Sequence, residues 1–173
     1  MALKRSQVYS NRANVQLVRR SVRCIQLNLH HSRAATTKFN QLITEQQCDL
    51  AFLQEPYTIE GKLTGITRKY KVFSQGNGKR RSAIVVVDKQ IDAILISQFS
   101  SEDITVMEFT QGKPNFIGIS IYMDITRKIG TELYKIDQLL NFAKWKAVIL
   151  AIDSNARSKL WNDKIANKRG RIL

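Results

Sequence analysis

An unbroken run of apolar residues from Ala147 to Ile152 is the clearest feature of the hydrophobic pattern. Because no polar residue alternates with the apolar ones, the pattern predicts a β-strand buried on both faces. Asp153 and Asn155 follow where this strand ends. The Asp153 carboxylate is able to orient or deprotonate a water, and the Asn155 amide is able to donate to an anionic oxygen. The alternative is an Asx turn in which both residues only cap the next segment.

The pattern after the N-terminal segment predicts a strand, a helix and a second strand. Residues 22–29 alternate between the two faces of a strand and place Asn28 near its end. Ser32 is a suitable N-cap for a helix whose apolar positions recur at helical spacing. Residues 48–53 form the next, almost wholly apolar strand, which leads into Glu55. Such a unit predicts two neighbouring parallel strands in one sheet.

The middle of the chain is predicted to be a meander of strands inserted between two helix-linked units. Gly76-Asn77-Gly78 is the strongest turn signal. The predicted strands are residues 70–74, 83–87, 91–99, 104–109 and 116–123. A helix introduced by Thr131 then leads to the apolar strand described first. The predicted fold class is a single α/β (α+β) domain of mixed sheets with helices on the outside.

The charge balance narrows the class of partner. The chain has 173 residues, the size of one domain, and its hydrophobic content of 43% is ordinary for a globular protein. Lys and Arg total 28 against 14 for Asp and Glu, which gives a net charge of +14. Such an excess favours a polyanionic partner through counterion release. Nucleic acid is the first candidate, and an anionic membrane surface is the second.

The remaining composition indicates an intracellular protein. The sequence has neither an apolar run as long as the ~20 residues of a membrane helix nor a signal-peptide core. Cys24 and Cys48 lack metal-ligand spacing and are expected to be small core residues in a reducing compartment. We expect residues 1–21 to be a basic arm and residues 22–173 the folded domain. The arm is a candidate phosphate-backbone contact, or else a solvated tail or a linker.

Polar residues suited to phosphate chemistry end several predicted strands. They are Asn28, Glu55 and the pair Asp153 and Asn155, and Tyr122 ends a further strand. Phosphodiester cleavage needs positive charge on the non-bridging oxygens, an oriented water and a donor for the leaving oxygen. A carboxylate such as Glu55 is a natural ligand for Mg²⁺. Considered alone, Glu55 is also consistent with an ordinary surface residue, and Tyr122 with an amphipathic residue at the edge of a sheet.

Four motifs in a fixed order carry a resemblance to a known family. They are Gln26-Leu27-Asn28, Leu53-Gln54-Glu55-Pro56, Ser120-Ile121-Tyr122 and Asp153-Ser154-Asn155-Ala156. In this order they resemble the endonuclease/exonuclease/phosphatase superfamily and, more narrowly, the apurinic-endonuclease-type domain of arthropod non-LTR (LINE) retrotransposons. The resemblance spans residues 22–170. It implies a DNase-I-like four-layer α/β/β/α sandwich of two mixed sheets, and a DNA endonuclease that nicks target DNA to prime reverse transcription.

The resemblance also implies a role for each motif residue. Glu55 would be the main ligand of Mg²⁺ (or Mn²⁺), with Asn28 beside it. Tyr122 would contact the scissile phosphate, Asp153 would orient the attacking water or serve the leaving group, and Asn155 would bind a phosphate oxygen. DNA in the nucleus would be the partner, with a fused reverse transcriptase domain and no membrane or small-molecule cofactor.

Several further residues are candidate DNA contacts. Lys79, Arg80 and Arg81 form a basic loop that either enters or flanks a DNA groove or is only a solvated hairpin tip. Arg157 stands where the retrotransposon relatives usually have a histidine, which either adds a phosphate contact or marks a decayed element copy. Trp161 is expected to pack in the core and not to serve as a base-stacking platform.

The end of the chain departs from the family pattern. The family's site is completed by a further aspartate and a Ser-Asp-His motif, whereas the only histidines here are His30 and His31. We therefore expect a C-terminally truncated domain that lacks its last strands, with nicking impaired by ~10²-fold or more. Two alternative functions remain: a catalytically dead nucleic-acid-binding fragment, and a phosphoinositide or sphingolipid phosphohydrolase of the same fold.

Overall fold

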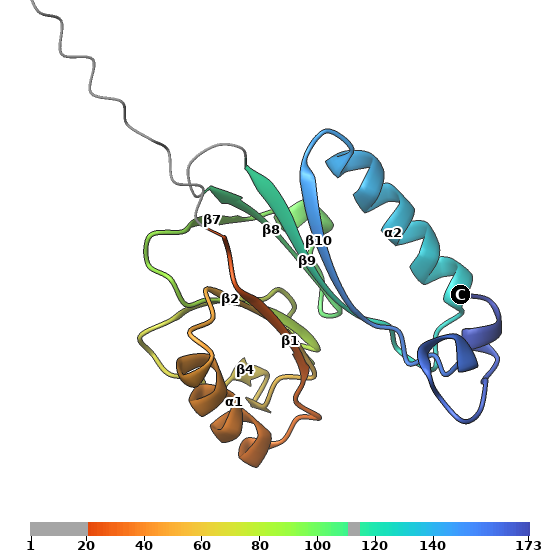
Figure 1. Ribbon diagram of the computed structural model, residues 1–173, viewed down its shortest axis with the longest axis horizontal. Helices are drawn as coiled ribbons and strands as arrows, with labels where there is room; N and C mark the ends of the chain where they lie inside the picture. The colour runs from red at the N-terminus through yellow and green to blue at the C-terminus, as the bar shows by residue number, and fades with distance from the viewer. Residues whose placement is uncertain (1–20, 111–114) are drawn as a thin grey trace, which may run out of the picture.

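Two four-stranded sheets pack face to face, and one long helix covers the outer face of each (Figure 1). The computed structural model describes residues 21–110 and 115–173. The first sheet has the strand order β1-β2-β6-β5. Its strands are β1 (Cys24–Asn28), β2 (Leu50–Gln54), β5 (Lys71–Phe73) and β6 (Ser82–Val86). Helix α1 (Arg33–Glu45) connects β1 to its parallel neighbour β2, as the sequence predicted.

The second sheet has the strand order β10-β9-β8-β7. Its strands are β7 (Asp92–Leu95), β8 (Ile104–Thr110), β9 (Phe116–Tyr122) and β10 (Ala147–Asp153). Helix α2 (Ile129–Ala143) connects β9 to its parallel neighbour β10. The short elements are β3 (Thr58–Ile59), β4 (Lys62–Leu63) and the 3₁₀ helices η1 (Ser97–Phe99), η2 (Lys159–Trp161) and η3 (Arg169–Arg171).

Three hydrophobic clusters fill the spaces between the four layers. Strand β2 shows how alternation produces them, because Ala51 and Leu53 pack toward α1 while Leu50 and Phe52 pack toward the second sheet. The third cluster lies between the second sheet and α2 and includes Leu139. The predicted α/β/β/α sandwich is therefore confirmed.

Strand β10 differs from the prediction that it is buried on both faces. Val148 and Ile152 pack toward α2, and Ile149 and Ala151 pack toward the first sheet. However, β10 is an edge strand, and the Leu150 side chain is 36% exposed. An unbroken apolar run reports contact on both faces but does not distinguish a central strand from an edge strand.

The predicted single meander also needs correction. Strands β5 and β6 belong to the first sheet, whereas β7, β8 and β9 form an antiparallel meander in the second. Ser32 caps α1 as predicted and accepts from the backbone N–H of Ala35 at 3.2 Å. Helix α2 begins at Ile129, before Thr131, and has no side-chain cap.

Other expectations concern single residues and the chain's surroundings. Cys48 is buried as expected, but Cys24 is exposed. The predicted basic arm lies outside the described residues apart from Ser21. Among the helices of the described part of the chain, none is long and apolar enough to cross a membrane.

Candidate active site

The edge strands β1 and β10 belong to different sheets, and their carboxyl ends meet (Figure 1). The Gln26 amide donates to the backbone oxygen of Ile152 at 2.9 Å. Two residues further along β1, the Asn28 amide donates to Oδ2 of Asp153 at 2.5 Å. These two bonds join residues more than a hundred positions apart in the sequence, so the sandwich brings both strand ends to one place.

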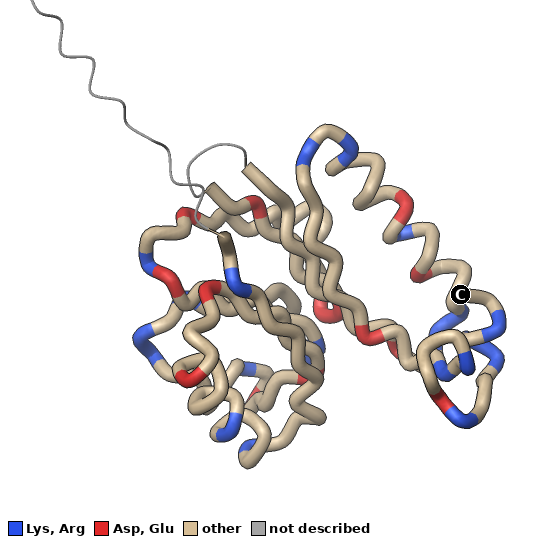
Figure 2. The backbone as a smooth tube through the Cα atoms, in the orientation of Figure 1, with Lys and Arg blue, Asp and Glu red and all other residues tan. Residues whose placement is uncertain are grey.

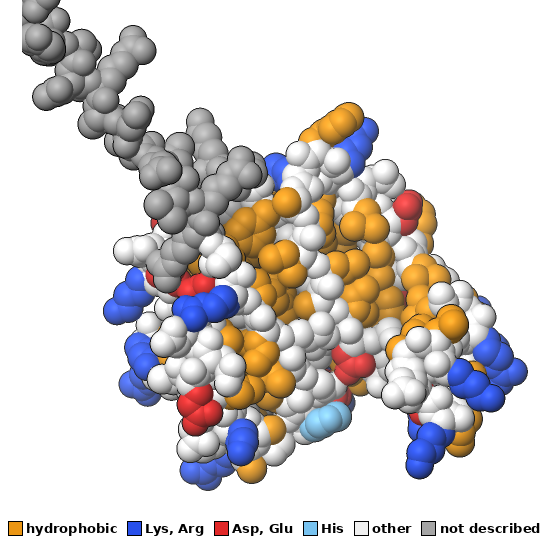
Figure 3. Space-filling view, viewed as in Figure 1, with side chains coloured by type: hydrophobic (Ala, Val, Ile, Leu, Met, Phe, Trp, Pro, Cys, Tyr) orange, Lys and Arg blue, Asp and Glu red, His pale blue; other side chains and the backbone are white. Residues whose placement is uncertain are grey.

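A pocket of about 570 Å³ lies at this junction. Asn28, Glu55, Asp153 and Asn155, which the sequence singled out, all contribute to its lining, and so does His30. The space-filling view shows a hollow there, with acidic side chains and a histidine at its edge (Figure 3). Four of the five predicted catalytic and metal-binding residues therefore share one pocket.

The Asp153 carboxylate closes a turn and also accepts a hydrogen bond from the other sheet. Its Oδ1 atom accepts from the backbone N–H of Asn155 at 3.1 Å, which closes the predicted Asx turn. Its Oδ2 atom accepts from Asn28 across the junction. The Asn155 side chain donates to the backbone oxygen of Met123 at 3.0 Å, which fixes the orientation of the amide. The turn thus positions the residues of the site.

Glu55 lies directly after β2 with a left-handed backbone, φ 47°. Two histidines flank its carboxylate: His30 Nδ1 lies 3.4 Å from Oε2, and His31 Nε2 lies 3.7 Å from Oε1. His31 Nδ1 is 3.0 Å from the backbone oxygen of Pro56. From the sequence, these histidines were either minor contributors to the mouth of the site or residues that only solvate the turn, and their contact with Glu55 comes from the fold.

Backbone strain is concentrated around this pocket. His30, His31, Glu55 and Asn155 all have positive φ angles, between 47° and 51°. Left-handed backbone costs free energy for a residue with a Cβ and persists where surrounding contacts enforce it, most often at functional sites. The clustering supports the assignment of this pocket as the candidate active site.

Tyr122, at the end of β9, is the fifth of the predicted catalytic and metal-binding residues. Burial raises the pKa of its hydroxyl, the negative charge of Glu55 adds to the increase, and a hydrogen bond with Asn155 acts in the opposite direction. Since the net effect is a pKa above the ordinary value, the hydroxyl keeps its proton at neutral pH. Tyr122 is therefore a hydrogen-bond donor in the site.

Arg81 is not free to contact DNA as predicted. Its guanidinium pairs with both oxygens of Asp103, at 2.5 and 2.9 Å, and with Asp124 at 2.6 Å. The guanidinium also lies 5.3 Å from the centre of the Tyr122 ring. Burial lowers the pKa of Arg81, but the hydrogen bonds and charges of the two aspartates outweigh it and raise the pKa. The sequence pattern missed both aspartates, since neither lies near Arg81 in the chain.

The other predicted DNA contacts lie outside the pocket. Lys79 is exposed, and Arg80 donates to the backbone oxygen of Gly76 at 3.3 Å and to Ser74 Oγ at 3.2 Å. The Arg157 guanidinium pairs with Asp163 through two bonds of 2.9 and 3.0 Å, and it is exposed.

The donor set fits a hard cation. Among the described residues, no group of three or more His, Cys, Asp or Glu side chains is arranged to hold a metal ion. What the pocket offers is the half-buried Glu55 carboxylate with amide and carboxylate oxygens nearby. Mg²⁺ keeps several of its waters and needs only one or two protein carboxylates, so this sparse set suits it.

Comparison with known proteins agrees with this geometry. No family model matches the chain. The endonuclease domain of TRAS1, a telomere-specific non-LTR retrotransposon, superimposes with a TM-score of 0.77 at 27% identity over 88% of this chain and 68% of that one. An endonuclease/exonuclease/phosphatase family protein from Leptotrichia buccalis superimposes with a TM-score of 0.53 at 16% identity over 83% of this chain and 69% of that one.

The fold is therefore that of the endonuclease/exonuclease/phosphatase class. Within it, the chain resembles the endonuclease domains of non-LTR retrotransposons. A putative 115 kDa protein of the type-1 retrotransposable element R1DM of Drosophila melanogaster is 26% identical over 158 residues, which cover 86% of this chain. The match spans only 15% of that protein's length.

Proposed function

We propose that the chain is a metal-dependent phosphodiesterase, the DNA endonuclease domain of a non-LTR retrotransposon that nicks target DNA to prime reverse transcription. The observation that carries this proposal is the Asn28–Asp153 bond, because it joins the ends of two sheets in the pocket that also contains Glu55. The likeness to the TRAS1 endonuclease domain supports DNA as the substrate. The net charge of +14 favours the same polyanion.

The residues divide the chemistry among them. Glu55 would hold Mg²⁺ (or Mn²⁺), which when bound would supply positive charge at a non-bridging phosphate oxygen. The protonated Tyr122 hydroxyl and the Asn155 amide donate to the phosphate. Asp153 orients the attacking water or serves the leaving oxygen, and Asn28 fixes the direction of its carboxylate through the 2.5 Å bond. Such preorganised donors stabilise charge that develops in the transition state.

Nicking of supercoiled plasmid tests this function. Because the sequence lacks the Ser-Asp-His motif of the family's site, we expect slow but Mg²⁺-dependent conversion of supercoiled to open-circular DNA by the native chain. We expect this conversion to be lost with EDTA and reduced by a further ~10²-fold or more in Glu55→Ala. Glu45→Ala is the matched control, because Glu45 is an exposed glutamate at the end of α1 and does not line the pocket. Nicking that Glu55→Ala leaves unchanged would contradict the proposal.

The same proteins separate the two alternatives. Salt-sensitive DNA binding that Glu55→Ala and Asp153→Ala leave intact, without any nicking, would favour a catalytically dead binding fragment. Release of phosphate from phosphoinositide or sphingolipid head groups, without nicking, would favour the phosphohydrolase. A nuclear site of action and a fused reverse transcriptase belong to the proposed retrotransposon function and are tested by locating the full-length element protein in cells.

A further inference from the structure

A pocket of about 560 Å³ lies where residues 167–172 meet the start of α2. Four cations line this basic pocket, and no acid among the described residues does. The cations are Arg127, Lys128, Lys168 and Arg169. Figure 2 shows lysine and arginine gathered where these two parts of the chain meet. The basic pocket shares no lining residue with the active-site pocket, so the proposed catalysis does not account for its charge.

The charge of Arg169 is buried without an ionic partner. Its side chain lines the pocket, the residue is 7% exposed, and no carboxylate of the described residues pairs with it. Its Nε donates to the backbone oxygen of Ser154 at 3.0 Å. Its Nη1 donates to the backbone oxygens of Asp124 at 2.8 Å and Arg127 at 3.2 Å, whereas Nη2 is buried without a hydrogen-bond partner. Since a buried charge costs free energy unless an opposite charge compensates it, an anion in this pocket would stabilise Arg169.

The start of α2 is a second, independent attraction for an anion. The helix has 15 residues, and Lys128 at its N-cap makes no side-chain hydrogen bond to it. The first N–H groups of a helix have no partner within the helix and carry the positive end of its dipole. Ile129 and Gly130, the first two residues of α2, line the pocket. The acid of the first turn, Glu132, is buried and forms ion pairs of its own, so the helix start is open to an external anion.

Two of the lining cations are available to a ligand. Lys128 and Lys168 are exposed, and neither forms an ion pair with a described residue. Arg127, by contrast, pairs with Asp103 at 2.8 Å. Isoleucine side chains complete the wall, so the pocket suits an anion that carries an organic group as well as a simple ion.

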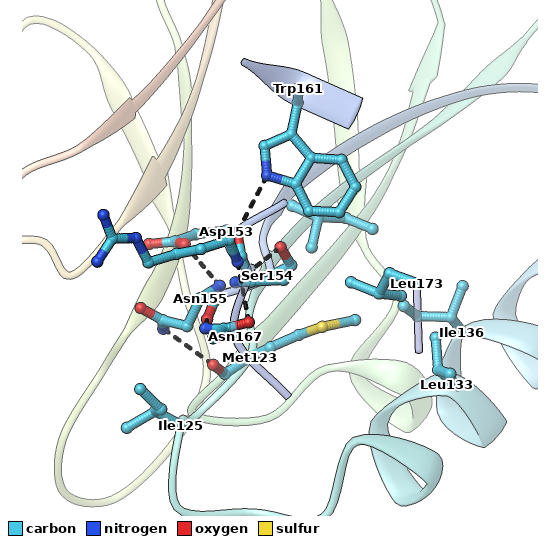
Figure 4. Close-up of a pocket in the computed structure, with 13 residues that line it drawn as sticks. Met123, Ile125, Leu133, Ile136, Asp153, Ser154, Asn155, Trp161, Asn167 and Leu173 are labelled. Atoms are coloured by element: carbon cyan, nitrogen blue, oxygen red, sulfur yellow. Dashed lines mark hydrogen bonds between the residues drawn. The ribbon is translucent and has the colours of Figure 1, made fainter. Parts of the chain in front are cut away.

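The basic pocket borders a larger, mostly apolar pocket of about 700 Å³ (Figure 4). Ile125 and Asn167 line both. Trp161 is part of the larger one, and although the sequence suggested core packing, this side chain is 46% exposed. The cation in the wall of the larger pocket, Arg157, is paired with Asp163. The unpaired positive charge therefore belongs to the basic pocket.

We propose that the basic pocket is a phosphate-binding site, in which Arg169, the first N–H groups of α2 and the two exposed lysines compensate the charge of the phosphate. A phosphate group suits this many donors because it offers more acceptor oxygens and more negative charge than a carboxylate. Bound phosphate would also act on the active site, because Arg169 holds the backbone oxygen of Ser154 between Asp153 and Asn155. The site is additional to the proposed endonuclease function and does not depend on it. The phosphate group comes from the DNA backbone or from a free phosphate compound.

Thermal unfolding in sodium phosphate, against sodium chloride of equal ionic strength and with EDTA present, tests the site. Replacing Arg169 would break its bonds to the backbone, so the variants change other parts of the pocket. Gly130→Asp places a carboxylate at the start of α2, where a Cβ atom meets nothing within 4 Å, and Gly130→Asn is its neutral control. The double variant Lys128→Ala with Lys168→Ala removes the exposed lysines. Lys144→Ala is the matched control, because Lys144 is an exposed lysine at the other end of α2 and outside the pocket.

We expect phosphate to raise the Tm of the native chain saturably and more than chloride does, because a ligand that binds only the folded state stabilises it. Gly130→Asp is expected to lose this response and Gly130→Asn to keep it. The double lysine variant is expected to bind phosphate about fivefold more weakly, and Lys144→Ala as tightly as the native chain. Tyr122→Phe is expected to keep the response, which separates this site from the active site. An equal response in the native chain and Gly130→Asp, or a response lost in Tyr122→Phe, would overturn the proposal.

The salt dependence of DNA binding identifies the source of the phosphate. If a backbone phosphate of DNA occupies the pocket, the slope of log Kobs against log salt is expected to fall by about one in the double lysine variant. An unchanged slope would assign the site to a free phosphate compound. Both results support the site, whereas a native chain that phosphate stabilises no more than chloride would overturn it, whether or not the chain nicks DNA.

Discussion

At the scale of single residues, Arg81 connects the two halves of the candidate site. Its backbone oxygen accepts from the N–H of Glu55 at 2.8 Å, and its guanidinium lies over the Tyr122 ring. Asp103 and Asp124 hold the guanidinium in place through its planar fork. We interpret Arg81 as a positioning residue that sets Tyr122 relative to Glu55.

Arg81→Lys tests this role. A lysine keeps the charge but cannot bridge two carboxylates in one plane. We expect kcat for nicking to fall by ~10- to ~100-fold, the usual effect of a small misplacement, with little change in DNA affinity. Lys79→Ala is the contrasting variant, because Lys79 is exposed and its loss is expected to weaken DNA binding and to leave kcat near native. A large loss of affinity in Arg81→Lys at native kcat would contradict the positioning role.

Asp124 gives a prediction for acid stability. Hydrogen bonds from Thr126, first its backbone N–H and then its hydroxyl, hold the pKa of Asp124 well below its usual range, and Arg81 lowers it further. Because the folded-state pKa lies below the unfolded value of about 3.9, this group stabilises the fold above that pH and loses its contribution as the pH falls below it.

Asp124→Asn is therefore expected to lower the free energy of unfolding by about 2 kcal/mol at pH 7. The difference from the native chain is expected to shrink as the pH falls below about 4. Urea unfolding of both proteins at neutral and acidic pH measures this difference in the free energy of unfolding. A difference that stays constant with pH would show that the ionised carboxylate is not the cause.

The candidate site could be predicted from the sequence only in part. Asn28, Glu55, Asp153 and Asn155 were found because each ends a strand and stands in a motif, and they do share one pocket. The histidine contacts with Glu55 were missed, since they depend on how a left-handed turn directs two adjacent side chains. The pairing of Arg81 was missed for a related reason, because its partners lie in loops next to β8 and β9 of the other sheet.

At the scale of elements, β9 depends on a glycine where the two sheets meet. A Cβ atom at Gly118 would lie 2.5 Å from the Phe109 ring and 3.0 Å from the Phe52 ring. Both rings are fully buried, so neither has space to move away. The close approach of the sheets at this point therefore requires a residue without a side chain.

Gly118→Ala is expected to lower the free energy of unfolding by about 1–3 kcal/mol, as overpacking does in well-packed cores. Gly130→Ala is the matched control, because a Cβ atom there meets nothing within 4 Å. In the exposed first turns of α2 it is expected to be neutral or to stabilise the fold by up to about 1 kcal/mol. Equal stability of the two variants in chemical denaturation would contradict the described packing.

The order of elements was largely predictable, whereas their distribution between sheets was not. The helix-linked strand pairs followed from apolar runs and a cap at Ser32. The strands between residues 70 and 123 looked alike in the pattern, yet β5 and β6 joined one sheet and β7 to β9 the other. Alternation records which residues are buried but not which sheet buries them.

At the scale of the whole molecule, each of the two α/β halves contributes one group of site residues, and the two groups lie at a common edge. The first sheet contributes Asn28 and Glu55, and the second contributes Tyr122, Asp153 and Asn155. The central claim is that these groups act as one phosphodiesterase centre and not as two independent turns. The bond between Asn28 and Asp153 is the contact that joins the halves.

A double-mutant cycle on this bond tests the claim most directly. Nicking rates are measured for the native chain, Asn28→Ala, Asp153→Ala and the double variant at saturating Mg²⁺. When two groups work as a unit, removing either one already removes most of their joint contribution to the rate. We therefore expect the double variant to nick no more than about threefold more slowly than the slower of the two single variants. Losses that multiply in full would contradict the account, because they would show that Asn28 and Asp153 act independently.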